Sequence, residues 1–394
     1  MPRIAIATLV LALLLAACGG GDNESEPTAT PPAGETPVIE STPTATESGV
    51  SIPQTEAAAN ITVPDGFTAY AIATGLNRAS SLALADDGTI YVSERAGTVY
   101  RLVDNDGNGV FETLTTFADG YAEITGLFVA PDNTVYVSSR GRITTERDTD
   151  GDGEADEDNA IIVGLPNGRH QNNGLLFGPD GKLYFTNGST CDDCVETDER
   201  SAAILQAEAD GSNVRVYATG LRNPYDIAFD ASGRLWSTDN GSDDPCATID
   251  ELDMIIDGGD YGWPYGEDGC DPLNDGIAPV ASLGLHTAST GIDYYSADQF
   301  PAQYQGNLYM TVWGSFFAEP ELPPQLLRGT ISARSGGPST DNPLEVVPEQ
   351  FAIGFQHPID VLVDHDGTLL VLDYGTNEAD DGSAAVYRIV YTGP

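Results

Sequence analysis

The stretch DDGTIYVSE at residues 86–94 decides the fold, because five further copies of its pattern follow along the chain. These copies are PDNTVYVSS (131–139), PDGKLYFTN (179–187), ASGRLWSTD (231–239), YQGNLYMTV (304–312) and HDGTLLVLD (365–373). In each copy a turn rich in Asp, Asn or Gly leads into alternating apolar residues, which is typical of a tight turn that opens a β-strand. Most copies start roughly 45–75 residues apart, the spacing of one four-stranded propeller blade with insertions. With almost no helical pattern between them, the copies predict an all-β, six-bladed β-propeller with a polar opening where loops converge on the axis.

The N-terminal stretch is predicted to lie outside this fold. Residues 1–18 combine a basic residue, an apolar run and a small-residue cleavage site, as in a secretory signal peptide. The segment Leu15-Ala16-Ala17-Cys18 resembles a bacterial lipobox, which predicts cleavage before Cys18 and an exported, membrane-anchored bacterial lipoprotein; an ordinary signal peptide is the alternative. Residues 19–60 are rich in Thr, Pro and Glu and are predicted to form a disordered acidic linker. The propeller is expected over residues 61–394.

The charge of the chain excludes some partners. The formal net charge is −45, with Lys182 the single lysine. Nucleic acid and anionic membrane surfaces are excluded as partners, because binding phosphate requires clustered Lys and Arg. An acidic surface of this kind can be solvated, or it can bind divalent cations. One chain can do both.

Four cysteines remain once Cys18 is assigned to a lipid: Cys191, Cys194, Cys246 and Cys270. An even number in an exported chain predicts two disulfides. Of the three possible pairings, Cys191–Cys194 with Cys246–Cys270 gives the least chain crossing. A zinc site is the alternative, although two of the cysteines stand alone in Asp-rich loops.

Two acidic loops have the spacing of calcium-binding loops. The first places Asp148, Asp150, Asp152 and Asp156 at positions 1, 3, 5 and 9, with glycine at position 6. Alternate side chains then point at one centre while the glycine allows the sharp turn. The second loop offers Asp104, Asp106, Asn108 and Glu112. Solvated acidic turns are the alternative, and in either case the loops are structural, since they contain no candidate base.

An ordered series of motifs from Gly168 to Tyr265 resembles the PQQ-dependent (pyrroloquinoline-quinone-dependent) sugar dehydrogenases, the soluble glucose and sorbosone dehydrogenase family. The series comprises the Asp-rich loop before His170, the cysteine pair after Gly188, GLRNP at 220–224 and DYGWP at 260–264. The resemblance covers nearly the whole folded region. It implies oxidation of a sugar or related alcohol with the quinone and calcium; the substrate and the electron acceptor stay open.

The resemblance also implies roles for individual residues. His170 corresponds to the general base that acts on the substrate hydroxyl while a hydride passes to the quinone. Arg222 and Asn223 correspond to quinone contacts, and the carbonyls of Gly241 and Ser242 to ligands of a calcium ion on the quinone. Glu123 corresponds to a polar contact near the cofactor, and His286 to a histidine of the sorbosone-type members. His357 is a further candidate contact, at the position of arginines that the family carries.

The residues support a compatible site independently. His170 lies on a loop at a blade edge, where a neutral imidazole can accept a hydroxyl proton. Arg222 begins another blade, where a scarce arginine is either an ion-pair partner or an anion contact. A hydrogen-bonded loop histidine is the alternative for His170.

The chain also departs from the pattern of the family. Ser189 replaces an acidic residue that orients the catalytic imidazole, a lysine is missing near Trp313, and Gln356-His357 replaces arginines. Fewer positive charges should weaken the binding of a quinone with three carboxylates. Two other interpretations therefore stay open. One is a non-catalytic cell-surface binding propeller. The other is a calcium-dependent lactonase-type hydrolase that centres a cation on Glu123, Asn223 and Asp373.

Overall fold

The computed structural model describes residues 50, 52–243, 249–264, 276–315, 321–334, 342–378 and 381–393, all within one structural unit, Ser48–Pro394. The predicted signal peptide, most of the predicted linker, Cys246 and Cys270 lie outside the described residues. The last part of the predicted linker is described and lies against the propeller. The Gln54 N–H donates to the Asn108 carbonyl and the Ala58 N–H to the Ala69 carbonyl, both at 2.8 Å. The ordered chain therefore begins before Ile61.

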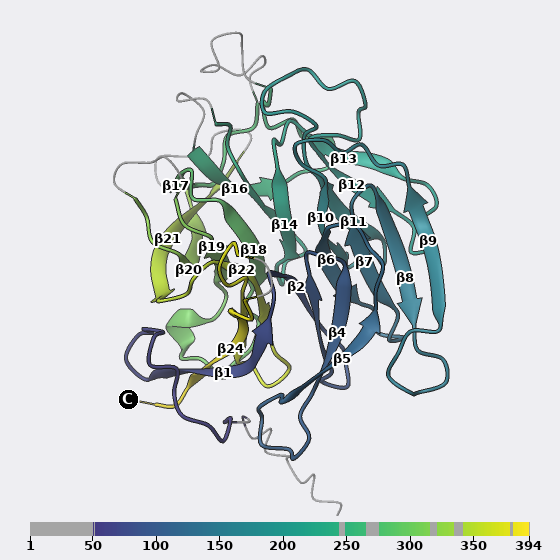
Figure 1. Cartoon of the computed structure of the whole chain (residues 1–394). Helices are drawn as coiled ribbons and strands as arrows, with labels where there is room; N and C mark the ends of the chain where they lie inside the picture. Colours follow the sequence, from purple (N-terminus) through teal and green to yellow (C-terminus); the bar gives the residue numbers. More distant parts are fainter. Residues whose placement is uncertain are drawn as a thin grey trace, which may run out of the picture. The chain divides into compact units, whose positions relative to one another are not determined.

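The strands form six antiparallel four-stranded sheets, which confirms the six-bladed propeller (Figure 1). From the innermost strand outward, blades one to three are β2 (Ala79–Leu84), β3 (Ile90–Glu94), β4 (Thr98–Val103) and β5 (Thr113–Ala118); β6 (Ile124–Val129), β7 (Val135–Ser139), β8 (Arg142–Arg147) and β9 (Glu157–Val163); and β10 (Asn172–Phe177), β11 (Leu183–Asn187), β12 (Ala203–Ala207) and β13 (Arg215–Thr219). Blades four and five are β14 (Pro224–Phe229), β15 (Leu235–Asp239), β16 (Ile249–Ile255) and β17 (Ala281–Leu285); and β18 (Ser289–Tyr294), β19 (Leu308–Val312), β20 (Gln325–Ala333) and β21 (Leu344–Ile353). Blade six is β22 (Pro358–Val363), β23 (Leu369–Asp373), β24 (Ala384–Tyr391) and β1 (Phe67–Leu76).

The six repeat copies form the second strand of each blade: β3, β7, β11, β15, β19 and β23. All five residues of each of these strands are buried. Both faces of a second strand pack against a neighbouring blade, which explains why these strands carry mostly apolar or small polar residues. The only helix among the described residues is a 3₁₀ turn, Ala302–Tyr304. Within that part of the chain, no helix is long and apolar enough to cross a bilayer.

Blade six joins the two ends of the propeller chain. Its outer strand, β1, comes from the start of the fold and pairs with β24 near the C-terminus. Phe67 of β1 secures this closure, since its ring lies 4.8 Å from Phe300 and 5.2 Å from Phe351 between ring centroids. Buried aromatic contacts of this kind contribute on the order of 1 kcal/mol each beyond the area that they bury.

Inner strands approach one another so closely that glycine is required at the contact. A Cβ on Gly126 of β6 would lie 2.3 Å from the Asn173 carbonyl oxygen, and one on Gly174 of β10 would lie 2.0 Å from the Asp226 carboxylate. Neither distance is possible for real atoms. The small residues therefore allow the ring to close tightly around its axis.

Candidate functional site

Two adjoining pockets collect the predicted base and most of the predicted quinone contacts. The His170 pocket, of about 270 Å³, is lined by Arg169, His170, Arg222, Asn223, Asn240, Gly241, Asp243, Asp250, His286 and Ala288. The Arg140 pocket, of about 250 Å³, is lined by Arg95, Glu123, Thr125, Arg140, Arg169, His170, Gln171, Asn173, Asn223 and Tyr225. Arg169, His170 and Asn223 line both. The structure thus brings His170, Arg222, Asn223, His286, Gly241 and Glu123 together, and Ser242 follows Gly241 as a buried residue.

The strand topology explains this gathering. Within a blade the first and second strands are antiparallel, so the start of the first strand lies beside the end of the second, as Pro224 lies opposite Asp239. Loops that enter a first strand and residues that follow a second strand therefore meet at one end of the propeller. His170 and Asn223 precede β10 and β14, whereas Arg140 and Asn240 follow β7 and β15.

His170 is held as a neutral imidazole with a defined proton. Its Nδ1 lies 2.9 Å from the hydroxyl of Ser189, and that hydroxyl donates its hydrogen to the Cys191 carbonyl at 2.6 Å. Because the hydroxyl has one hydrogen, it accepts from Nδ1–H, which leaves the lone pair on Nε2. Burial, together with the charges of Arg222 and Arg169, lowers the pKa of His170 to about 3. The ring is therefore uncharged at neutral pH, with a lone pair on Nε2.

Arg222 is buried beneath the disulfide loop. Its side chain is 4% exposed and forms an ion pair with Asp192, while Nη1 donates to the Asn240 carbonyl at 3.1 Å. Burial disfavours the charge of Asp192, but the hydrogen bond and charge of Arg222 outweigh it and lower the pKa of that carboxyl. Asp192 lies inside the Cys191–Cys194 disulfide, which confirms one predicted pairing. The loop thus fixes both Arg222 and, through Cys191, the partner of His170.

Two buried carboxylates hold the remaining loops. Asp239, at the end of β15, accepts the backbone N–H groups of Arg222 (2.9 Å) and Asn223 (2.6 Å). Asp250 accepts the N–H of Gly241 at 3.0 Å and the hydroxyl of Thr287, beside His286, at 2.9 Å. Burial raises the pKa of both carboxyls, that of Asp239 to about 7. These contacts fix the carbonyls of Gly241 and its neighbour near the pocket.

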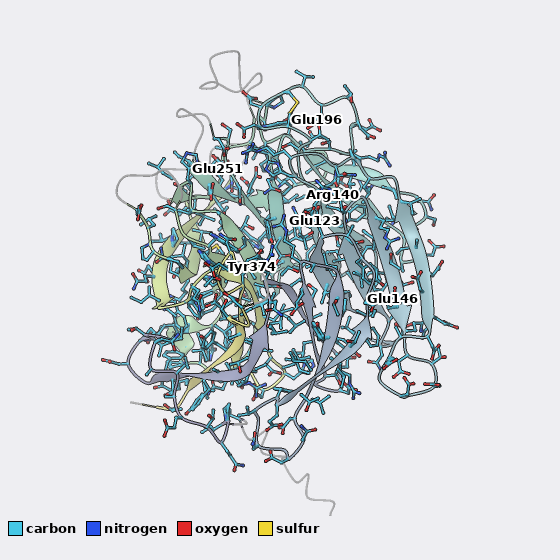
Figure 2. The ribbon with its side chains drawn as sticks, in the orientation of Figure 1. Glu123, Arg140, Glu146, Glu196, Glu251 and Tyr374 are labelled. Carbon is cyan, nitrogen blue, oxygen red and sulfur yellow. A yellow bond between two sulfur atoms is a disulfide. The ribbon has the colours of Figure 1, made fainter. Side chains whose placement is uncertain are left out.

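Glu123 faces the pocket from blade two in a left-handed backbone conformation with φ of 46°. Its carboxylate lies 2.8 Å from Arg140 and 4.0 Å from Arg95, and its carbonyl accepts the Gln171 side chain at 2.8 Å. Such a conformation in a residue other than glycine costs energy and is concentrated at functional sites. Figure 2 shows Glu123 and Arg140 beside each other near one end of the propeller.

Other predicted residues lie apart from these two pockets. His357 lines a separate pocket of about 310 Å³, where its ring stacks on Trp313 at 4.4 Å between centroids. Asp373, assigned to the lactonase interpretation, is buried and accepts the N–H groups of Gln356 (2.7 Å) and His357 (2.8 Å). It lines neither of the two pockets.

The two acidic loops are equivalent hairpins in adjacent blades, between β4 and β5 and between β8 and β9. Oxygen atoms of Asp104, Asp106 and Glu112 lie within 4.8 Å of one another, as do those of Asp148, Asp150 and Asp156. Asn108 and Asp152 accept backbone N–H groups of their own loops, at 2.7 and 2.9 Å, as the clustered Asp104 and Asp148 do at 2.8 and 2.6 Å. Neither loop lines the two pockets, in agreement with a structural role.

Several residues at the site were not assigned from the sequence. Arg95, Arg140, Arg169, Gln171 and Asp192 are among them, and Ser189 was noted only as a departure from the family pattern. A signal was present in the repeat itself. Arg95, Arg140 and Asn240 each directly follow a repeat copy, and the ends of the second strands border the pockets.

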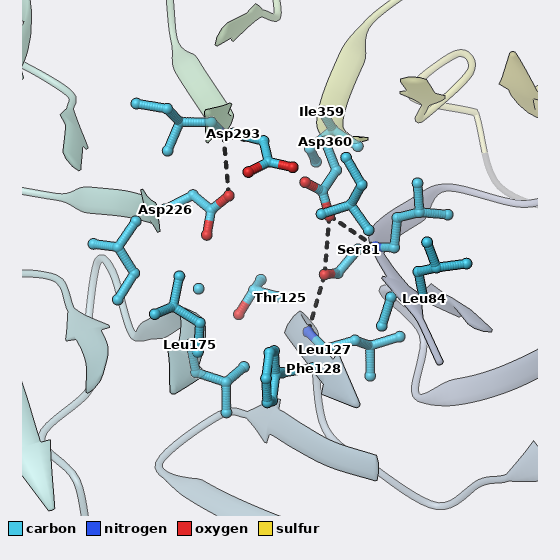
Figure 3. A pocket seen from close by; sticks show the side chains of 18 of the residues that line it. Ser81, Leu84, Thr125, Leu127, Phe128, Leu175, Asp226, Asp293, Ile359 and Asp360 are labelled. Carbon is cyan, nitrogen blue, oxygen red and sulfur yellow. Dashed lines mark hydrogen bonds between the residues drawn. The ribbon is translucent and has the colours of Figure 1, made fainter. Parts of the chain in front are cut away.

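A third cavity, of about 260 Å³, is lined by residues of the inner strands (Figure 3). Asp226, Asp293 and Asp360 line it from consecutive blades, and each accepts a backbone N–H from the next blade, at 3.1, 2.8 and 2.8 Å. Burial raises the pKa of all three carboxyls, to about 6 for Asp293 and about 7 for Asp360. These aspartates tie the blades together around the ring.

Known proteins were compared with the chain by sequence. Quinoprotein glucose dehydrogenase B of Acinetobacter calcoaceticus is 25% identical over 256 residues, which cover 51% of this chain and 53% of that protein. The HIPL1 protein of Arabidopsis thaliana is 29% identical over 214 residues, which cover 39% of this chain and 30% of that protein. The chain therefore spans about half the length of the first relative.

Solved structures share the fold. The holo form of the pyranose dehydrogenase PQQ domain from Coprinopsis cinerea superimposes with a TM-score of 0.67 at 16% identity, covering 86% of this chain and 98% of that one. The PQQ-bound aldose sugar dehydrogenase from Streptomyces coelicolor gives a TM-score of 0.62 at 22% identity, covering 84% and 99%. The resemblance to PQQ-dependent sugar dehydrogenases is thereby confirmed at the level of the fold.

A family profile described as a domain of unknown function (DUF7133) matches residues 53–314. This match includes every residue of the two pockets. The chain therefore belongs to the DUF7133 family, and it has the six-bladed propeller expected from its resemblance to the quinoprotein sugar dehydrogenases.

Proposed function

We propose that this protein is an oxidoreductase that oxidises a sugar or related alcohol with pyrroloquinoline quinone and calcium, with His170 as the general base. One observation carries the proposal: a neutral imidazole, with its proton fixed on Nδ1, lies in the same pocket as Arg222 and Asn223. The named relatives support the same chemistry.

The residues of the His170 pocket fit the quinone. A planar group with carboxylates requires cationic and amide donors. Asn223 offers an amide, and Arg169 and Arg222 line the same pocket as ion-pair partners of Asp243 and Asp192. The carbonyls of Gly241 and Ser242 are suited to calcium, which prefers oxygen ligands. When bound, the quinone supplies hydride acceptance and the calcium polarises the accepting carbonyl.

His170 supplies the proton-accepting step. Its Nε2 lone pair takes the proton of the substrate hydroxyl, while Ser189 keeps the other nitrogen protonated. A bound anion beside the ring offsets the charges of Arg222 and Arg169 and raises the pKa of His170 toward neutral pH. A base acts most effectively in that range.

The test is reconstitution of the purified protein with quinone and calcium, followed by dye reduction with aldoses. We expect His170→Gln to lose at least about 100-fold in kcat, the range of a general base, while quinone binding, followed by absorbance, persists. Full turnover by this variant would remove His170 from the mechanism. Acid release from gluconolactone without an electron acceptor would instead identify a lactonase.

The two acidic loops are proposed as structural calcium sites, supported by their converging carboxylates. The lipid anchor and the export signal stay predictions. They are tested by incorporation of labelled palmitate in cells, measured for the natural chain and for a Cys18→Ala variant.

A further inference from the structure

We infer that the Arg140 pocket is a carboxylate-binding subsite beside His170. The identity of the ligand rests on the proposed function, whereas its negative charge does not. The ligand is a small molecule that carries a carboxylate. This carboxylate belongs either to an acidic sugar that binds as substrate or to the quinone.

Positive charge is concentrated in this pocket in an otherwise acidic chain. The chain has 16 Lys and Arg against 61 Asp and Glu. Arg95, Arg140 and Arg169 nevertheless line one pocket together with a single carboxylate, Glu123. Arg169 is paired with Asp243 and lies 3.5 Å from Asp192, so the surplus charge belongs to Arg95 and Arg140, which share one glutamate.

The guanidinium groups of Arg95 and Arg140 differ in how many contacts they make with the protein. Arg140 contacts Glu123 at 2.8 Å and donates to the Gly168 carbonyl at 2.9 Å. Arg95 reaches Glu123 only at 4.0 Å, and its side chain is 47% exposed. A guanidinium has five N–H donors in a planar fork that matches a carboxylate. Arg95 therefore has donors available for a second carboxylate on the open side of Glu123.

The backbone of Glu123 is held in place independently of its carboxylate. Its left-handed φ and the hydrogen bond from Gln171 to its carbonyl fix the residue between the two arginines. In the free protein its carboxylate neutralises part of the arginine charge. It thus competes with a ligand carboxylate for the same donors.

The placement connects the subsite to the proposed chemistry. Arg169, His170 and Asn223 line both pockets, so a carboxylate held by Arg95 and Arg140 lies next to the imidazole. The pocket of Trp313 and His357 offers no such charge: among the described residues lining it, none is Arg or Lys and one is Glu321. The cationic side of the site is formed by blades one to three.

The experiment measures binding by titration calorimetry, without turnover, on the calcium-loaded protein. Glucuronate and glucose are compared as a pair that differs in one carboxylate, and quinone is titrated separately. Variants Arg95→Gln and Arg140→Gln are set against Arg147→Gln, an exposed arginine of blade two that pairs with Asp132 at 3.4 Å. We expect each pocket variant to weaken the carboxylate ligand by about 10-fold or more, the range of one charged hydrogen bond, and the control to change nothing.

The arms distinguish the two sources. If the arginine variants bind glucuronate more weakly and quinone as before, the subsite belongs to an acidic substrate. If they bind quinone more weakly and glucuronate as before, it belongs to the quinone. Glu123→Gln removes the competing carboxylate and should tighten binding of the same ligand. Unchanged affinities for both ligands in the arginine variants, or an equal loss in Arg147→Gln, would overturn the subsite.

Failure of the subsite and failure of the proposed function give different results. Arginine-dependent glucuronate binding in a protein that reduces no dye would remove the dehydrogenase activity and leave the subsite. Dye reduction by a protein whose affinities for glucuronate and for quinone do not change in Arg95→Gln and Arg140→Gln would do the reverse.

Discussion

Ser189 illustrates how a single hydroxyl defines the chemistry of the site. The residue is fully buried, accepts from His170 Nδ1–H and donates to Cys191. A serine in this position gives the imidazole an uncharged hydrogen-bond partner. The residue that departs from the family pattern therefore still orients the ring through a hydrogen bond.

We expect Ser189→Ala to lower kcat by about 10-fold with little change in KM, because the ring loses its fixed tautomer while the binding residues stay in place. Ser189→Asp should move the acidic limb of the kcat–pH profile upward by about one unit or more, since a carboxylate stabilises the imidazolium. Steady-state kinetics across pH measure both. Ser201→Ala, which removes another buried hydroxyl of blade three bonded to the Gly188 carbonyl, is the control. An unchanged kcat in Ser189→Ala would leave the serine without a positioning role.

Each acidic hairpin brings its carboxyl groups together without any contact to the two pockets. In each loop, three carboxyl groups lie within 4.8 Å of one another. The loop of blade two also docks on blade one, where its Ala155 N–H donates to the Phe117 carbonyl at 2.8 Å. A cation in this loop would therefore stabilise the contact between two blades.

Saturating calcium should raise the melting temperature relative to EDTA by about 5 °C or more, since binding at 100 times Kd contributes about 2.7 kcal/mol. Asp148→Asn with Asp150→Asn should remove a large part of this rise. Asp158→Asn, outside the loop on β9, should retain it. Differential scanning calorimetry provides the measurement, and a rise that survives in the loop variant would exclude this loop as a calcium site.

At the scale of the whole molecule, the interior holds many carboxyl groups. Burial, with added repulsion from neighbouring carboxylates, raises the pKa of Glu251 to about 8, and burial raises that of Glu146 to about 7. Asp253 is an extreme case, because neither of its buried carboxyl oxygens has a hydrogen-bond partner among the described residues. Burial raises the pKa of Asp253 well above its usual value.

These shifts predict how stability depends on pH. A carboxyl whose pKa is higher in the folded state binds its proton more tightly there, so its contribution is present at low pH and is lost as the pH rises through the folded value. We therefore expect the melting temperature to fall by about 5 °C or more between pH 5 and pH 8 in EDTA. Repulsion within a chain of net charge −45 acts in the same direction.

Asp253→Asn tests the cause, since the amide keeps the shape of the protonated carboxyl and does not ionise. The variant should melt at a higher temperature than the natural chain at pH 8 and show a smaller fall between pH 5 and pH 8. Asp86→Asn, in the exposed turn before β3, serves as the control. A melting temperature that stays flat or rises with pH would contradict the prediction.

The sequence alone determined the features that depend on neighbouring residues. The repeated turn and its alternating apolar residues predicted six blades, and the copies proved to be the buried second strands, because turn type and burial pattern are local properties. The acidic loops and the Cys191–Cys194 pair followed from spacing for the same reason. His170, Arg222 and Asn223 were assigned through the resemblance to the sugar dehydrogenases, and each stands shortly before the first strand of a blade.

Only the tertiary structure decided what those residues contact. The closure of blade six by β1, the bond from His170 to Ser189 and the gathering of Arg95, Arg140 and Arg169 join loops from separate blades or strands. No local pattern encodes such pairs, because they follow from the end at which each antiparallel strand begins and ends around the ring. The proton of His170 and the charge of the pocket beside it are therefore properties of the closed propeller.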